Sequence, residues 1–156
     1  MNKFLTVDAA LVLVLLGLGA AGWWWSPYFL PQADVTATPV AGCDLHQGPC
    51  RAILSGEGGE GGFLELSIEP RPIPFVKPLS VTVTFSGIDA RKVDIDFSGR
   101  DMNMGYNRPP LVVESPNRFI GGATLPVCIT GKMAWKATVL VENDQGQRIV
   151  APFQFE

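Results

Sequence analysis

The chain has 156 residues and a formal net charge of −3, with 12 Lys and Arg against 15 Asp and Glu. This length allows one membrane segment and one domain large enough to bury a hydrophobic core. Lys and Arg form no dense cluster, so the basic surface that a nucleic-acid-binding protein needs is missing and that class is excluded. With 17 Gly and 13 Pro, the composition is typical of short strands joined by turns rather than of a helical protein.

The N-terminal segment is strongly apolar from Ala9 onward, and no charged residue occurs between Asp8 and Asp34. A run of this length can cross about 30 Å of hydrocarbon. The alternative is a cleaved secretory signal, since Lys3 provides a short basic start and the small residues over 17–22 resemble a cleavage region. Aromatic residues typical of a membrane interface follow the run at once and favour an uncleaved anchor. They are Trp23, Trp24, Trp25 and Tyr28.

The orientation of this anchor is predicted from its short N-terminal tail. The tail carries Lys3 and precedes all the rest of the chain, so the positive-inside rule leaves it in the cytoplasm. We therefore expect a single-pass protein of the inner (cytoplasmic) membrane whose domain faces the periplasm. Residues 1–30 are the expected anchor. Residues 31–42 belong to a proline-containing stretch without periodicity and are the expected linker, followed by a domain over 43–156.

Beyond Cys43, short segments alternate apolar and other residues with a period of two, which is the pattern of half-buried strands. The clearest of these segments has Leu64, Leu66 and Ile68 on one face. The predicted strands are 63–69, 80–85, 92–97, 111–114, 118–125, 136–142 and 148–155. Gly, Pro and Asn-Asp turns separate them. The pattern predicts an all-β fold, an immunoglobulin-like or cupredoxin-like antiparallel β-sandwich with an N-terminal transmembrane helix.

Three features that suggest an enzyme fail when their chemistry is considered. The glycine-rich stretch 56–62 lacks the Lys-Ser/Thr end of a phosphate-binding loop and is interpreted as a flexible loop. Asp94 and Asp96 lie on the outward face of a predicted strand, where carboxylates are usually solvated. His46 is the single histidine and no Gly-x-Ser-x-Gly motif accompanies it, so no hydrolytic triad is indicated. We expect no enzymatic activity and identify no small-molecule substrate.

The chain contains 3 cysteines. Cys43 and Cys50 enclose a short loop containing Gly and Pro, and in an exported domain such a pair most often forms a disulfide. Closing so short a loop contributes on the order of 2 to 3 kcal/mol. Cys128 is then left over, and two interpretations stay open for it: a small buried hydrophobe or a thiolate ligand.

Most of the sulfur in the soluble part of the chain lies between Arg100 and Lys136. The residues are Met102, Met104, Cys128 and Met133. Thioether and thiolate ligands suit Cu(I) better than any hard cation. Met102 and Met104 fall at a strand end or loop where both can point the same way, and Met133 is placed to approach the same end of the sandwich. Trp135 is placed to cover a bound cation with its ring face. The alternative is that the methionines fill irregular gaps in the core.

These motifs also suggest a family. The Met-x-Met-Gly motif at 102–105, the later Phe-Ile-Gly-Gly and Leu-Pro-Val-Cys segments, and the Gly-Lys-Met-Ala-Trp motif at 131–135 resemble the membrane-anchored FixH-like and YtkA-like proteins. The resemblance spans Val81 to Glu142. It implies a small sandwich domain linked to copper handling and to the assembly of haem-copper oxidases.

Two functions from different classes therefore stay open. The first is a membrane-anchored periplasmic Cu(I)-binding protein that acts as a copper chaperone and delivers the metal to a membrane partner such as a haem-copper oxidase. The second is a non-metal structural or assembly subunit of a membrane complex, in which the methionines belong to the core. A blue-copper centre is excluded in both cases, because it requires two histidines.

Overall fold

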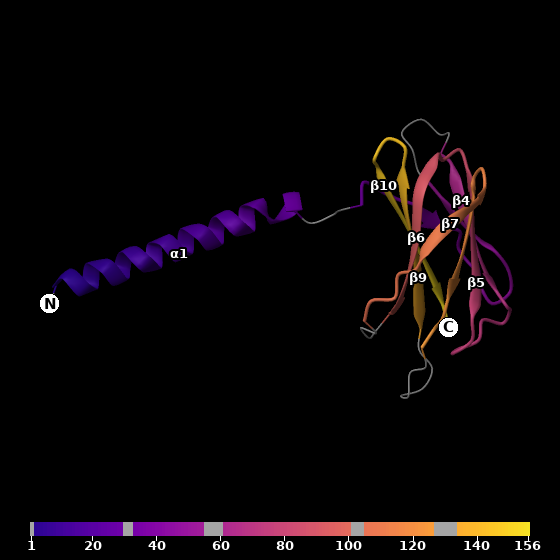
Figure 1. Ribbon diagram of the computed structural model, residues 1–156, viewed down its shortest axis with the longest axis horizontal. Coiled ribbons are helices and arrows are strands. Elements are labelled where there is room, and N and C mark those ends of the chain that lie inside the picture. Colours follow the sequence, from indigo (N-terminus) through magenta and orange to yellow (C-terminus); the bar gives the residue numbers. More distant parts are fainter. Residues whose placement is uncertain (1, 30–32, 55–60, 101–104, 127–133) are drawn as a thin grey trace. The chain divides into compact units, whose positions relative to one another are not determined.

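The computed structural model describes residues 2–29, 33–54, 61–100, 105–126 and 134–156, with the side chains of the N-terminal helix described over 11–24. The chain divides into two compact units, Met1–Gln32 and Ala33–Glu156. The first contains helix α1 (Asn2–Phe29), and the second contains the strands (Figure 1). The strands are β1 (Val35–Thr36), β2 (Thr38–Pro39), β3 (Cys50–Ile53), β4 (Phe63–Glu69), β5 (Leu79–Ser86), β6 (Ala90–Gly99), β7 (Pro110–Ser115), β8 (Arg118–Ala123), β9 (Trp135–Asn143) and β10 (Arg148–Phe155).

Helix α1 has 28 residues and no acidic residue in its first turn or basic residue in its last. Its apolar side chains are distributed around the axis rather than along one stripe, so no side of the helix is set apart for packing against a core. Large apolar side chains such as Leu13 and Trp23 are exposed. Within the part of the chain that the structure describes, no helix combines the length and the apolar character needed to cross a membrane.

The strands form one 10-stranded sheet in the order β1-β10-β9-β6-β7-β8-β5-β4-β3-β2. This sheet folds into two layers, with β10, β9 and β6 in one and β8, β5, β4 and β3 in the other (Figure 1). Strand β7 joins the layers, because Leu111 pairs with β6 while Val112 and Val113 pair with β8. The all-β class predicted from the sequence is therefore confirmed, and the observed arrangement is that of a sandwich or barrel.

The first and last strands in this order, β1 and β2, follow each other directly in the sequence. Strand β1 pairs in parallel with β10, and β2 pairs antiparallel with β3. Ala37, which separates β1 from β2, is completely buried. One bent segment thus covers the outer strand of each layer and links the two edges of the sheet through the chain itself; we call this two-layered unit the barrel.

The predicted period-two alternation is confirmed by burial. In β5, and in β6 over 93–97, every second residue is buried, and the residues between are exposed or half-buried. The buried set is Leu79, Val81, Val83, Phe85, Val93, Ile95 and Phe97. Full burial of one such side chain contributes about 1.5–3 kcal/mol, so this alternation decides which face of each strand meets the core. The predicted strands 63–69 and 148–155 coincide with β4 and β10.

The start of the β unit differs from the prediction. The unit begins at Ala33 rather than near Cys43, and the expected linker 31–42 contains β1 and β2. The physical reason is that these strands are held by partners remote in sequence: Ala37 N–H donates to the Val150 carbonyl oxygen at 2.8 Å. Segments of two residues cannot show a period-two pattern, so sequence periodicity does not detect them.

Candidate functional site

The predicted copper ligands Met102, Met104, Cys128 and Met133 lie outside the described residues. The described ends of the segments that carry them meet at one end of the barrel, which we call the Trp135 end. Arg100 N–H donates to the Ala134 carbonyl oxygen at 2.8 Å, and Gly99 pairs with Trp135. The Asn107 carboxamide nitrogen donates to the Thr124 carbonyl oxygen at 3.1 Å. The described residues that flank 101–104 and 127–133 therefore lie together at this end.

Trp135, predicted to cover a bound cation, is a core residue with only 1% of its surface exposed. Its ring packs against Phe75 with centroids 6.4 Å apart and planes tilted by 37°. Its Nε1–H is buried and has no hydrogen-bond partner among the described residues. A buried donor without an acceptor costs about 1–3 kcal/mol, so an acceptor brought to this end would stabilise it. The covering role of Trp135 stays a prediction.

His46 is held at the same end of the barrel. Its Nδ1 accepts a hydrogen bond from Ile73 N–H at 3.0 Å, and its ring meets the Phe155 ring edge-on with centroids 5.7 Å apart. Because Nδ1 is the acceptor, this hydrogen bond assigns the proton of the neutral ring to Nε2. That tautomer leaves Nε2 without a free lone pair for a metal, so His46 positions the Ile73 segment and is not a ligand in this arrangement.

The predicted disulfide between Cys43 and Cys50 is confirmed, with Cα atoms 5.6 Å apart. Cys50 is buried in the core. Within the closed loop, the Asp44 carboxylate accepts hydrogen bonds from His46 N–H and from the Gln47 side chain, each at 2.9 Å. The hydrogen bond from the His46 backbone is the main cause that lowers the pKa of Asp44. The disulfide and Asp44 together hold the loop that presents His46.

The outward carboxylates of β6 are paired with cations rather than with each other. Asp94 lies 3.3 Å from Lys92 Nζ, and Asp96 lies 3.3 Å from Arg108 Nε. These side chains form no acid dyad, in keeping with their interpretation as surface residues. Among the described residues, no group of three or more His, Cys, Asp or Glu is placed to hold a metal ion.

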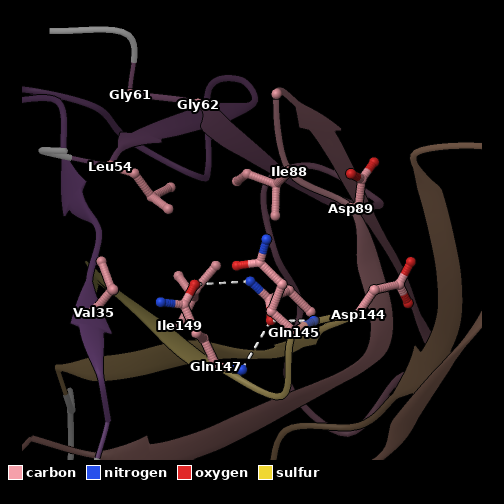
Figure 2. Close-up of a pocket in the computed structure, with 12 residues that line it drawn as sticks. Val35, Leu54, Gly61, Gly62, Ile88, Asp89, Asp144, Gln145, Gln147 and Ile149 are labelled. Carbon is pink, nitrogen blue, oxygen red and sulfur yellow. Dashed lines mark hydrogen bonds between the residues drawn. The ribbon is translucent and has the colours of Figure 1, made fainter. Parts of the chain in front are cut away.

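A cavity of about 360 Å³ opens at the opposite end of the barrel, which we call the Asn143 end because Trp135 and Asn143 are the first and last residues of β9 (Figure 2). It was not predicted from the sequence. Four apolar side chains line it: Val35, Leu54, Ile88 and Ile149. Carboxamides and carboxylates line the rest, from Asn143, Gln145, Gln147, Asp89 and Asp144. An apolar wall with a few polar groups is the usual constitution of a small-molecule site.

The polar side of the cavity is built by Asn143. Its Oδ1 accepts hydrogen bonds from Gln145 N–H at 3.0 Å and Gln147 N–H at 2.8 Å, and its Nδ2 donates to Gln147 Oε1 at 3.0 Å. Gly146 has a φ of 77°, the left-handed conformation that this turn requires. Figure 2 shows the carboxamide of Gln145 directed into the space between Leu54 and Ile88. For these residues the sequence predicted only a turn between two strands.

Two glycines shape the opposite side of the cavity. A Cβ on Gly62 would lie 2.5 Å from the Ser86 carbonyl oxygen and 2.9 Å from that of Gly87. Gly87 has a φ of +70°, and a Cβ added to it would lie 3.3 Å from the Cα of Gly62. The close approach of these two backbones therefore requires glycine at position 62. The glycine-rich stretch 56–62, interpreted as a loop, thus ends on a residue with a packing role.

Comparison with known proteins adds no assignment, because no protein-family model, no curated protein and no solved structure matches this chain. The resemblance to FixH-like and YtkA-like proteins therefore stays a prediction. A function for this chain must come from the chemistry of its own residues.

Proposed function

We propose that this protein is a membrane-anchored periplasmic protein that binds Cu(I) and delivers it to a membrane partner. The observation that supports the proposal is that Arg100 and Ala134, which flank the two sulfur-bearing segments, are joined by a hydrogen bond. Met102 follows Arg100 by two residues, and Met133 directly precedes Ala134. Thioethers, joined by the Cys128 thiolate, are the ligand set that selects Cu(I).

The described surroundings suit a soft cation. Trp135, Phe155 and Leu125 are all buried, so the core at the Trp135 end is apolar. Such a core limits access of water and disfavours Mg²⁺, which retains several waters when bound. In this proposal the protein binds copper and transfers it to a partner, so copper is its cargo. Uncharged thioether ligands would allow the metal to exchange.

Attachment to the membrane is part of the same proposal, with α1 as a transmembrane anchor. This part rests on the apolar run that starts at Ala9, of which the structure describes the side chains over 11–24. A helix that is apolar on all sides is stable inside lipid or a protein core, and the exposed Leu13, Leu15 and Trp24 have no such cover within their own unit. The Cys43–Cys50 disulfide supports a periplasmic location, since disulfides persist in oxidising compartments. N-terminal sequencing of membrane-fraction protein tests the anchor. A mature chain starting near Trp23 refutes it.

The finer fold assignment, an immunoglobulin-like or cupredoxin-like sandwich related to the FixH-like and YtkA-like proteins, also belongs to this proposal. That relation names a haem-copper oxidase as the partner to test first. The alternative, a non-metal assembly subunit, would bind through a sheet edge. The outermost strands of the sheet are β1 and β2, of two residues each, so the edge they offer is short. We place the copper proposal first because the residues that flank the two sulfur-bearing segments lie together, as the hydrogen bond from Arg100 to Ala134 indicates.

Metal content tests the proposal directly. The full-length chain, purified in a neutral detergent, is loaded with Cu(I) in ascorbate, which maintains Cu(I) while leaving the disulfide oxidised. After dialysis we expect copper to remain bound in competition with a chromophoric Cu(I) chelator, and X-ray absorption at the copper edge to show sulfur ligands. A chain that retains no copper above a metal-free control protein refutes the proposal.

A further inference from the structure

We propose that the cavity at the Asn143 end binds a small organic cation, an ammonium or guanidinium group carried on a short apolar chain. This site is independent of the copper proposal, because Asn143 and Trp135 stand at opposite ends of β9. Its volume of about 360 Å³ falls within the range of about 300–1,000 Å³ typical of small-molecule sites.

The apolar wall of the cavity is built into the core. Ile88 and Ile149 are 7% and 3% exposed, so their positions are fixed by packing before any ligand arrives. Leu54 lies opposite Ile88 in Figure 2, and Val35 lies beside Ile149, its register partner on the neighbouring strand. A short alkyl chain entering here removes apolar surface from water on both partners, which favours binding. A preformed wall avoids the cost of ordering side chains on binding.

The carboxamide of Gln145 stands between these apolar walls and supplies an oxygen that can accept a hydrogen bond from an ammonium or guanidinium N–H (Figure 2). Its backbone is held by the hydrogen bond to Asn143 Oδ1 at 3.0 Å. The turn therefore places Gln145 in a defined position relative to Ile88. A ligand with both an apolar chain and a polar head matches this arrangement, while a purely apolar ligand leaves the carboxamide without its hydrogen bond.

The sign of the ligand charge follows from the acidic residues of the lining. Among the described residues that line the cavity, Asp89 and Asp144 carry charge and none is Lys, Arg or His. A backbone hydrogen bond from Asp144 N–H to the Asp89 carbonyl oxygen at 3.2 Å holds the two residues on one side of the opening. Both side chains are exposed, so their attraction for a cation is modest and falls with added salt. An anionic head is repelled by the same pair.

The test is a titration of the ¹⁵N-labelled full-length chain, in neutral detergent at low salt, with n-butylammonium, 1-butanol and butanoate. These probes each contain four carbon atoms and differ in charge. We expect saturable shifts at the amides of Gly62, Gly87 and Gln145, with butylammonium binding about fivefold more tightly than butanol and butanoate most weakly. Equal affinity for butylammonium and butanol overturns the proposal, as do shifts that never saturate.

The matched variant is Asp89→Asn with Asp144→Asn, which preserves side-chain shape and removes both charges. The preference for butylammonium over butanol should disappear in this variant and persist in Glu156→Gln, which removes a carboxylate next to Phe155 at the other end of the barrel. Gln145→Ala, on an exposed turn, should weaken all three probes. If the paired Asp variant, with an otherwise unchanged amide spectrum, keeps the full preference, the assigned origin of the selectivity is refuted.

Discussion

Removal of the Cys43–Cys50 disulfide has a consequence that can be worked out from the structure. The two residues are separated by 7 positions in the sequence. In the chain-entropy model, releasing so short a loop lowers the free energy of unfolding by about 2 to 3 kcal/mol. For a β unit of this size, that loss corresponds to a melting temperature lower by on the order of 10 °C. The variant to make is Cys43→Ala with Cys50→Ala, because Ser at buried position 50 would add an unpaired hydroxyl.

The same variant should have a local signature. The loop presents His46 to Ile73 N–H, so loosening the loop should raise hydrogen exchange at the Ile73 amide more than at the amides of β9 and β10. The assays are thermal unfolding by near-ultraviolet circular dichroism and hydrogen exchange by NMR. Gly48→Ala is the control in the same loop, since no atom lies within 4 Å of the added Cβ. An unchanged melting temperature together with unchanged exchange at Ile73 would refute the structural role assigned to the disulfide.

Three further predictions concern the copper ligands, the change of stability at acid pH and the cavity wall. Met102→Leu with Met104→Leu should abolish Cu(I) retention while costing less than about 1.5 kcal/mol in urea unfolding; unchanged copper affinity would show these methionines to be core. The pKa of Asp44 is lowered in the folded state. Its carboxylate therefore stabilises the fold fully above its ordinary pKa of 3.8, and this stabilisation is lost as the pH falls through the pKa of the folded state. Melting curves of wild type and Asp44→Asn should accordingly differ above that pH and converge below it, and a constant difference would contradict the assignment. Gly62→Ala brings a Cβ to 2.5 Å from a backbone oxygen and should cost about 1–3 kcal/mol, whereas Gly48→Ala should stay within about 0.5 kcal/mol; equal melting temperatures would show that the strands adjust.

Local pattern was sufficient for the longer strands and for the disulfide. Leu64, Leu66 and Ile68 alternate with polar residues, and a strand with that alternation can bury one face against almost any partner. The bounds of β4 and β10 therefore follow from their own residues. Cys43 and Cys50 were predictable as a pair because they are only 7 positions apart, so the entropy lost in bringing them together is small. The sulfur ligands, which lie outside the described residues, remain a prediction based on ligand chemistry.

Tertiary structure alone decided the pairing of β1 and β2, the tautomer of His46 and the existence of the cavity. Strands β1 and β2 are too short for a periodic pattern and exist because β10 and β3 supply their hydrogen bonds. The proton of His46 is assigned by the N–H of Ile73, 27 residues further along the chain. The cavity joins Val35, Ile88 and Gln145, which meet only after the sheet has formed. In each case the deciding interaction joins segments that are remote in sequence. Such contacts form only when the chain folds, so local sequence patterns do not reveal them.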